Sequence, residues 1–256
     1  MKLKSLFLTL TLVMLYGCNT DLDDSTNQTT VSLKFTHHWD GVQVTNSGLN
    51  AFSYTNAFGN LLSIERLRYL ISDLVLTKNN GQTIEIENYS LINIANESSL
   101  AYVTTDLIET GSFSNLSFVF GFTNEKNSNG SYNDLNSESW NVPLMLGGGY
   151  HYMQMDGKFL NTDNIEQGYN YHAIRAVDNP GDNPSFPQDT FFRVNLGAVS
   201  IKEDGEINIA MNIAEWFKNP STWNLNDYNQ MLMPNSAAQI IMYENGQNAF
   251  TLVNNN

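Results

Sequence analysis

The sequence is poor in cysteine, in basic residues and in long apolar runs. Cys18 is the only cysteine among 256 residues, so no disulfide can form within the chain and no other thiolate can bind a metal. Twelve lysines and arginines stand against 26 acidic residues, which gives a formal net charge of −14. A surface of this sign repels nucleic acid and anionic lipid, so we expect no nucleic-acid partner.

The first eighteen residues have the pattern of a bacterial secretory signal. Lys2 and Lys4 precede the apolar run LFLTLTLVML, which is too short to span a bilayer. Residues 15–18, LYGC, resemble a lipobox, in which signal peptidase cuts before the cysteine and lipid is attached to its thiol. We predict a signal peptide over residues 1–17 and a lipidated Cys18. The alternative is an ordinary signal peptide that contains a cysteine.

The lipid anchor predicts a location in the cell envelope, as an outer-membrane lipoprotein that is periplasmic or surface-exposed. Residues 18–30 contain the polar stretch NTDLDDSTNQTT, which cannot bury enough apolar surface to order itself and reads as a flexible tether. Loss of residues 1–17 removes two basic residues and no acidic one, so the formal charge changes from −14 to −16. Residues 31–256 are predicted to form one β domain.

From residue 31 onward, short strands are separated by turns rich in Asn, Gly and Asp. LRYLISDLVLT, the turn KNNG and QTIEIENYSLINI predict a β-hairpin, because Asn-Gly supplies the positive φ of a tight turn. TFFRVNLGAVSI and GEINIAMNI predict a further pair around residues 202–205. IAEWFKNP and SAAQIIMYENG predict short helices, the second capped by Asn235. The predicted fold class is all-β, an antiparallel sandwich or barrel-like single domain with one or two short C-terminal helices.

Two of the four histidines lie on apolar strand faces. In GGGYHYMQMDG, strict alternation places His151 with Met153 and Met155, and in GYNYHAIRAV it places His172 with two apolar residues. Imidazole and thioether ligands, with no carboxylate on the same face and no thiolate, suit Cu(I) better than zinc, calcium or magnesium. The predicted copper ligands are therefore His151, His172, Met153 and Met155. At most one of the adjacent His37 and His38 could join an interior site, because neighbours on a strand point to opposite faces.

The register of the predicted hairpin decides whether one ion could bridge the two imidazoles. His151 opposes His172 if paired residue numbers sum to 323, with a loop over residues 159–164, and opposed Cβ atoms then lie about 5 Å apart. A sum of 327 places Met155 opposite His172 and moves His151 roughly 13 Å along the strand. The sequence leaves both registers open. It also leaves open a pair of inert core histidines beside space-filling methionines.

The order of several motifs resembles that of the MbnP-like family. These are RYLISDLVL, VFGFT, WNVPLMLGGGYHYMQMDGKF, YNYHAIR and FFRVNLG, and the closing IAEWFKNP…WNLN…MLMPNSAAQIIMYENGQNAF is similar to its Bacteroidetes lipoprotein branch. The resemblance implies a secreted or periplasmic β protein that binds copper, with His151 and His172 as ligand candidates. For some members it also implies a di-haem peroxidase-like partner.

Some members of that family hold copper with histidines and an oxidised tryptophan, kynurenine. Here Trp140 lies eleven residues before His151, and Trp39 follows the histidine pair. Neither spacing matches those relatives, so we infer that Met153 takes the place of the modified tryptophan.

The sequence predicts a binding protein and not an enzyme. It has no Gly-x-Ser-x-Gly and no His-Glu-x-x-His motif, and the one cysteine is predicted to be lipidated. The leading hypothesis is a lipid-anchored protein that captures or buffers Cu(I). The alternative is a module that binds a glycan or protein, without metal, through a row of exposed tyrosines on the opposite face of the same hairpin: Tyr150, Tyr152, Tyr169 and Tyr171. Burial of one face or the other distinguishes the two.

Overall fold

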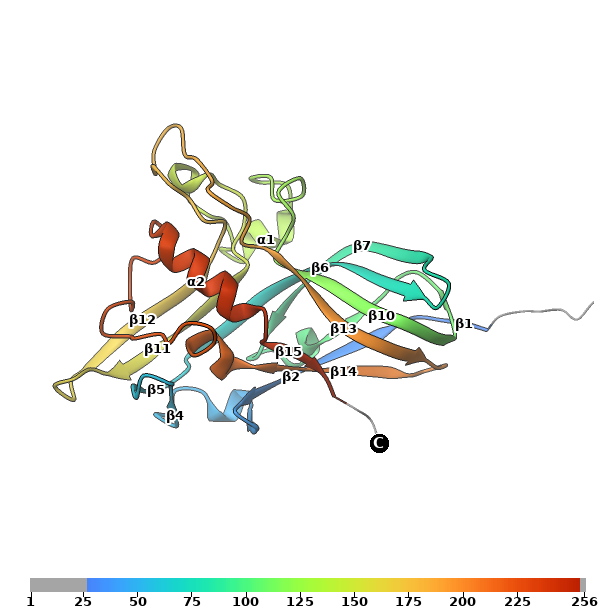
Figure 1. Ribbon diagram of the computed structural model, residues 1–256, viewed down its shortest axis with the longest axis horizontal. Coiled ribbons are helices and arrows are strands. Elements are labelled where there is room, and N and C mark those ends of the chain that lie inside the picture. The colour runs from blue at the N-terminus through green and yellow to red at the C-terminus, as the bar shows by residue number, and fades with distance from the viewer. Residues whose placement is uncertain (1–26, 254–256) are drawn as a thin grey trace, which may run out of the picture.

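The computed structural model describes residues 27–253, which form an all-β fold with a helix near the C-terminal end (Figure 1). The larger sheet is antiparallel and eight-stranded, and β7 and β12 join it by pairing with β6 and β11. Its strands are β13 (Phe192–Ile201), β10 (Gly111–Phe120), β6 (Arg66–Lys78), β11 (Met153–Leu160), β5 (Leu61–Leu62), β4 (Tyr54–Thr55), β7 (Thr83–Asn93) and β12 (Glu166–Ala173). The predicted fold class is confirmed.

A second, five-stranded sheet faces the first across the main core. Within it β14 runs parallel to β2, and the other pairs are antiparallel. Its strands are β15 (Phe250–Leu252), β14 (Glu206–Asn212), β2 (Ser32–Trp39), β3 (Val42–Val44) and β8 (Ala101–Val103). A separate pair joins β1 (Gln28–Thr29) to β9 (Ile108–Glu109), so regular structure begins within the segment predicted to be a tether. The predicted signal peptide and Cys18 lie outside the described residues.

The local turn and cap predictions agree with the structure. β6 and β7 form the predicted hairpin, with the Lys78 amide bonded to the Gln82 carbonyl at 2.8 Å and Gly81 at φ 86°. Helix α2 (Ser236–Gly246) has the predicted cap, since the Asn235 side chain accepts a bond from the Ala238 amide. The shorter helical pieces are α1 (Asn133–Ser137), η1 (Asn46–Gly48), η2 (Glu97–Leu100), η3 (Leu144–Leu146) and η4 (Ile213–Phe217).

The predicted pairing of residues 190–201 with 205–213 is wrong. β13 pairs with β10, and β14 pairs with β2 and β15, so the turn at 202–205 carries the chain from one sheet to the other. A tight turn reverses the chain but does not choose which strand edge receives it. Strand pairing depends instead on the apolar residues of both strands, which are buried against different neighbours.

The two faces of the larger sheet are covered differently. The inner face packs against the second sheet in an aromatic core that includes Phe35, Tyr69, Phe120 and Trp216. The outer face of β6, β11 and β12 is covered by loops, which form two small apolar clusters around Trp140 and around Ile174. None of the helices among residues 27–253 is long and apolar enough to cross a membrane. The candidate site lies on this loop-covered outer face.

Candidate metal centre

The register of the β11–β12 hairpin differs from both registers considered from the sequence. Paired residue numbers sum to 326, so Met153 faces Ala173, Gln154 faces His172 and Met155 faces Tyr171. The loop runs from residue 161 to 165 and closes with a bond from the Asn161 amide to the Ile165 carbonyl at 3.0 Å. On this register His151 lies just before β11 begins, outside the regular ladder.

The strict alternation assumed for residues 151–155 breaks at Tyr152. Tyr152 and Met153 are adjacent in sequence, yet both side chains lie in the main core. His151 is therefore free of the strand's alternation and lies beside His172, with ring centroids 5.3 Å apart and planes at 85°. The structure thus brings together the two histidines predicted as ligands.

Met153 and Met155 are not brought to these histidines. Both are fully buried in the main core, on the sheet face that also carries Tyr171. The expectation that no carboxylate shares the histidines' face also fails, because Asp156 lies on the face of His172 and bonds to it. The slip at Tyr152 explains both differences, since it moves His151 to the face that Gln154 and Asp156 occupy.

One ring nitrogen of His151 bonds to a backbone carbonyl, and the other contacts a sulfur. Its Nδ1 lies 2.8 Å from the Trp140 carbonyl oxygen, and its backbone amide bonds to the same oxygen at 2.9 Å. A carbonyl only accepts, so Nδ1 carries the hydrogen. Burial lowers the pKa of His151 to about 4, although the Trp140 bond opposes this, so the ring is neutral at pH 7.

The remaining nitrogen of His151 consequently has a lone pair and no hydrogen. This Nε2 lies 3.2 Å from Sδ of Met233. A thioether sulfur has no hydrogen to donate either. Two lone pairs therefore face each other in a buried place, which is unfavourable unless a cation or another acceptor of electron pairs lies near both.

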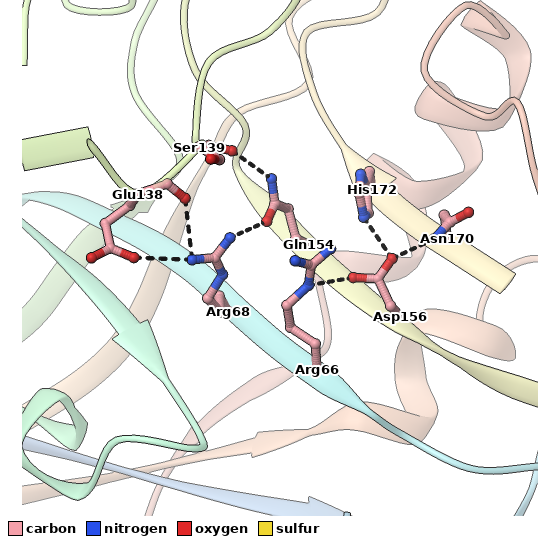
Figure 2. Close-up of polar contacts among 8 residues, drawn as sticks. All are labelled: Arg66, Arg68, Glu138, Ser139, Gln154, Asp156, Asn170 and His172. Atoms are coloured by element: carbon pink, nitrogen blue, oxygen red, sulfur yellow. Dashed lines mark hydrogen bonds and ion pairs between the residues drawn. The ribbon is translucent and has the colours of Figure 1, made fainter. Parts of the chain in front are cut away.

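His172 is oriented by a carboxylate. Its Nε2 donates to Oδ1 of Asp156 at 2.8 Å, and Asp156 also accepts bonds from Asn170 and Arg66 (Figure 2). Burial opposes the charged form of Asp156, but the bond and charge of His172 and the bonds from Asn170 and Arg66 outweigh it and hold its pKa well below the ordinary value. With Nε2 carrying the hydrogen that bonds to Asp156, Nδ1 is the ring nitrogen of His172 that is left for a metal. A hydrogen bond from one ring nitrogen to a carboxylate or carbonyl is typical of metal-binding histidines, and both residues have one.

Arg68 fixes the loop at Glu138, two residues before Trp140, and Figure 2 shows its bonds to Glu138 and Gln154. Its guanidinium donates to Oε1 of Gln154 and to both the carbonyl and the carboxylate of Glu138, and it lies 5.1 Å from the centre of the Trp140 ring. Gln154 in turn donates to the Ser139 carbonyl at 3.3 Å. Since Gln154 faces Arg68 across β11 and β6, the sheet register sets where the carbonyl that orients His151 lies.

Gln239 on helix α2 connects the two histidine neighbourhoods. Its buried side chain donates to the carbonyls of His172 and Leu232, at 2.9 and 3.0 Å, and accepts from the amide of Ile174 at 2.8 Å. It thereby satisfies backbone groups on the free edge of β12 and holds the segment before α2 against that edge. Met233 belongs to this segment, so Gln239 is a positioning residue for its sulfur.

A hollow of about 510 Å³ opens over these groups. We call it the methionine hollow, and its walls are formed by Met145, Leu146, Asn170, His172, Met231, Leu232, Met233 and Pro234. Among residues 27–253, no three His, Cys, Asp or Glu side chains lie together as a metal site. The donors at this place are instead two imidazoles and a thioether, a set that fits Cu(I) and fits the harder divalent ions poorly.

A model of the MbnP family matches residues 28–235. The chain belongs to the MbnP family. Among solved structures, MbnP from Methylosinus trichosporium is similar, with 12% identity, a TM-score of 0.53, and coverage of 77% of this chain and 80% of that chain. At that identity the likeness supports a common fold alone. No curated protein matches the chain.

In this MbnP-family chain, Trp140 lies beside His151, although the two are eleven residues apart in the sequence. The two ring centroids are 5.7 Å apart, because a bridge between Asn141 and Tyr150 folds the intervening segment back on itself. Trp39 packs elsewhere, 5.1 Å from the Tyr54 ring. Sequence spacing was therefore a poor guide to which tryptophan approaches the histidine.

The other histidine pair of this MbnP-family chain is not part of the site. His37 is buried in the main core with Nε2 3.1 Å from the Tyr69 hydroxyl, and His38 lies 3.1 Å from the hydroxyl of Thr36. His37 alone faces the interior, which agrees with the expectation that at most one of the two could.

The tyrosine row proposed as a binding platform is buried in this MbnP-family chain. Tyr150, Tyr152, Tyr169 and Tyr171 are each at most 1% exposed. The hydroxyl of Tyr169 donates to the Ser63 carbonyl and that of Tyr171 to the Trp216 carbonyl. Tyr152, Tyr169 and Tyr171 pack in the main core and Tyr150 in the cluster around Trp140, so the expected platform of exposed tyrosines is wrong.

Three residues of the site in this MbnP-family chain lie outside the ligand set predicted from sequence: Met233, Asp156 and Trp140. Met233 lies 82 residues from His151, beyond any local pattern. One signal was present, since MLMP places two methionines in a loop just before the capping Asn235.

Proposed function

We propose that this MbnP-family protein binds Cu(I) through His151, His172 and Met233, and captures or buffers the ion without catalysing a reaction. The observation that carries the proposal is the contact of 3.2 Å between Nε2 of His151 and Sδ of Met233. Both atoms present lone pairs, and neither has a hydrogen to share. A soft cation near both would turn an unfavourable contact into two favourable ones.

The protonation state of His151 supports the same proposal. Metal ligands must be deprotonated, and the lowered pKa of His151 leaves its ring neutral throughout the neutral pH range. The Trp140 carbonyl holds the hydrogen on Nδ1, so the free lone pair is already on the nitrogen that faces Met233. Little rearrangement of the ring is then needed when an ion binds.

The ligand chemistry favours Cu(I) over other ions. The proposed donors are two imidazoles and a thioether, and a thioether binds soft monovalent ions and is a weak ligand for zinc, calcium and magnesium. Asp156 serves as the partner that orients His172 in this arrangement, with its carboxylate shared among His172, Asn170 and Arg66. Its charge stabilises the ligand set without occupying the position of a ligand.

The cellular setting of this function remains as predicted from the sequence. We propose attachment to the outer membrane through lipid on Cys18, and for a partner, a di-haem peroxidase-like protein. The acidic surface, with a formal charge of −14, would attract copper and other cations in general without selecting among them.

The test is a titration of Cu(I) into the purified protein against a competing chelator. Wild type should bind one ion tightly, and Met233→Leu should bind it about 10- to 100-fold more weakly, because a leucine keeps the apolar volume but has no sulfur. His172→Ala should weaken binding at least as much. The matched control is Met155→Leu, which removes a thioether buried in the main core.

Two results would contradict the proposal. One is wild type that does not compete with the chelator. The other is equal binding by wild type, Met233→Leu and His172→Ala, with each shown to be folded by circular dichroism.

A further inference from the structure

We infer that Met145 and Met231 form an outer thioether site at the mouth of the methionine hollow, which receives Cu(I) from a donor and transfers it to Met233 and His151. This inference rests on the proposed function. It adds residues that take no part in the final ligand set and assigns them to loading of the site.

The distribution of methionines supports the inference. The described residues contain seven, of which Met153, Met155, Met211 and Met242 are at most 1% exposed in the core. The other three all line the one hollow, although they come from two segments more than eighty residues apart: Met145, Met231 and Met233. Packing in the core explains the first four, and Met233 also packs on the cluster around Ile174. Packing does not explain why the exposed Met145 and Met231 border the same hollow.

The exposures of these three side chains form a path from solvent to the buried imidazole. Met231 is 79% exposed and Met145 is 57% exposed, whereas Met233 is half-buried and His151 is 4% exposed. A single exposed apolar side chain is ordinary on a protein surface, but here two exposed thioethers border one hollow. Met233 lies between the exposed methionines and the buried imidazole, since it lines the hollow and its sulfur contacts Nε2 of His151.

The backbone holds Met231 outward at some cost. Its φ is 55°, in the left-handed region that residues other than glycine adopt rarely. The next residue, Leu232, is buried, and its carbonyl is fixed by Gln239, so residues 231 and 233 are presented at the mouth and at the base of the hollow. Met145 is held by a bond of 2.8 Å from the Gly181 amide to its carbonyl.

Thioether chemistry suits a site for passage. A thioether is neutral and does not titrate, binds soft monovalent ions, and exchanges readily because each single bond is weak. Met145 and Met231 would bind Cu(I) as the ligands of the donor leave, and Met233 and His151 would replace them in turn. Copper stays in the same oxidation state, and the Nδ1 hydrogen of His151 stays in its bond to the Trp140 carbonyl.

Loading kinetics test the inference. Cu(I) would be supplied as its bicinchoninate complex, whose colour fades as the protein takes the ion, to wild type and to the Met145→Leu/Met231→Leu double variant. We expect the double variant to reach the same end point about tenfold more slowly. Leu144→Ala is the matched control, since Leu144 is 71% exposed in the same 3-10 helix and has no sulfur.

Two outcomes of this experiment overturn the inference and leave the proposed function intact. One is loading of the double variant at the wild-type rate. The other is an equal slowing in Leu144→Ala, which would mean that apolar surface and not sulfur matters. Wild type that takes no copper would overturn the proposed function and the inference together.

A second measurement reads the outer thioethers directly. Ag(I) would be titrated into the His151→Ala variant carrying methyl-labelled methionine, and the methionine methyl resonances followed by NMR. Shifts confined to Met145, Met231 and Met233 support the outer site, with Met211 and Met242 as internal controls buried in the core. Absence of a shift at both Met145 and Met231 contradicts it.

Discussion

His37 and His151 are two buried histidines whose pKa values are lowered alike, in both cases chiefly by burial. They are 2% and 4% exposed, and burial lowers the pKa of each to about 4. Nε2 of His37 lies 3.1 Å from the Tyr69 hydroxyl, whereas Nε2 of His151 lies 3.2 Å from the Met233 sulfur. A hydroxyl both donates and accepts, so it satisfies His37 in either tautomer, but a thioether cannot satisfy His151.

This comparison shows that burial and a lowered pKa do not distinguish a ligand from a core histidine. What distinguishes them is the atom that lies opposite the second ring nitrogen, a hydroxyl for His37 and a thioether sulfur for His151. His37 is in contact with the aromatic ring of Tyr69 in the main core, while His151 contacts Met233, which lines a hollow that reaches solvent. The two residues should therefore differ in how their substitution changes Cu(I) binding, although both affect the free energy of unfolding.

Acidification should show the property that the two histidines have in common. Each has a folded pKa of about 4 against 6.5 when unfolded, so between these values the unfolded chain binds more protons. The free energy of unfolding of the metal-free protein should therefore fall by up to about 3 kcal/mol per histidine as pH drops from 7 to 4. Denaturant unfolding at several pH values measures this loss.

The variants His37→Gln and His151→Gln show how much of this fall in the free energy of unfolding each histidine causes. Each should remove about one histidine's share of the pH dependence, because glutamine does not titrate. Carboxylates such as Asp156 contribute equally in all three proteins and cancel in the difference. A variant that retained the full wild-type dependence would show that the substituted histidine is charged in the fold.

Copper should separate the two histidines. At a free Cu(I) concentration of about 100 times Kd, binding stabilises the folded state by about 2.7 kcal/mol. This gain should persist in His37→Gln and vanish in His151→Ala, because only the second removes a proposed ligand. Thermal unfolding with and without Cu(I) measures the gain, and its survival in His151→Ala would rule out that residue.

Loss of Gln239 should affect stability and binding together. Gln239→Leu leaves the carbonyls of His172 and Leu232 and the Ile174 amide without their partner, which should cost about 2 kcal/mol or more in the free energy of unfolding. Cu(I) affinity should fall about tenfold as Met233 loses its position. Denaturant unfolding and chelator competition measure these effects.

The control for that variant is Gln247→Leu, at the exposed end of the same helix, where the side chain bonds only to the Tyr243 carbonyl. It should leave both measurements within error of wild type. Unchanged copper affinity in Gln239→Leu, despite the lost stability, would show that Met233 is positioned by other contacts.

Asp156→Asn should have the smallest effect. The amide oxygen can still accept the bond from His172, but the charge that Arg66 and His172 share is lost, so Cu(I) affinity should fall about tenfold or less. Glu166→Gln is the control, since it removes a carboxylate paired with Lys158 on the exposed part of the hairpin. Equal affinities of Asp156→Asn and wild type in chelator competition would exclude a role for the carboxylate charge.

The features read correctly from sequence are those that a few neighbouring residues decide. The Asn-Gly turn of the β6–β7 hairpin, the Asn235 cap and the all-β class depend on local backbone preferences and on alternation within single strands. His151 and His172 were identified as a pair of interest on the same local grounds. Family membership, which the motifs indicated, is also confirmed.

Only the tertiary structure decided how those residues meet. The register sum of 326 and the slip at Tyr152 follow from which side chains the two sheets bury together, and one such slip exchanged Met153 for Asp156 on the histidines' face. Met233 reaches His151 across 82 residues because Gln239 ties its segment to β12. Strand faces are a periodic property of sequence, but register and long-range contacts depend on the packing of the whole fold.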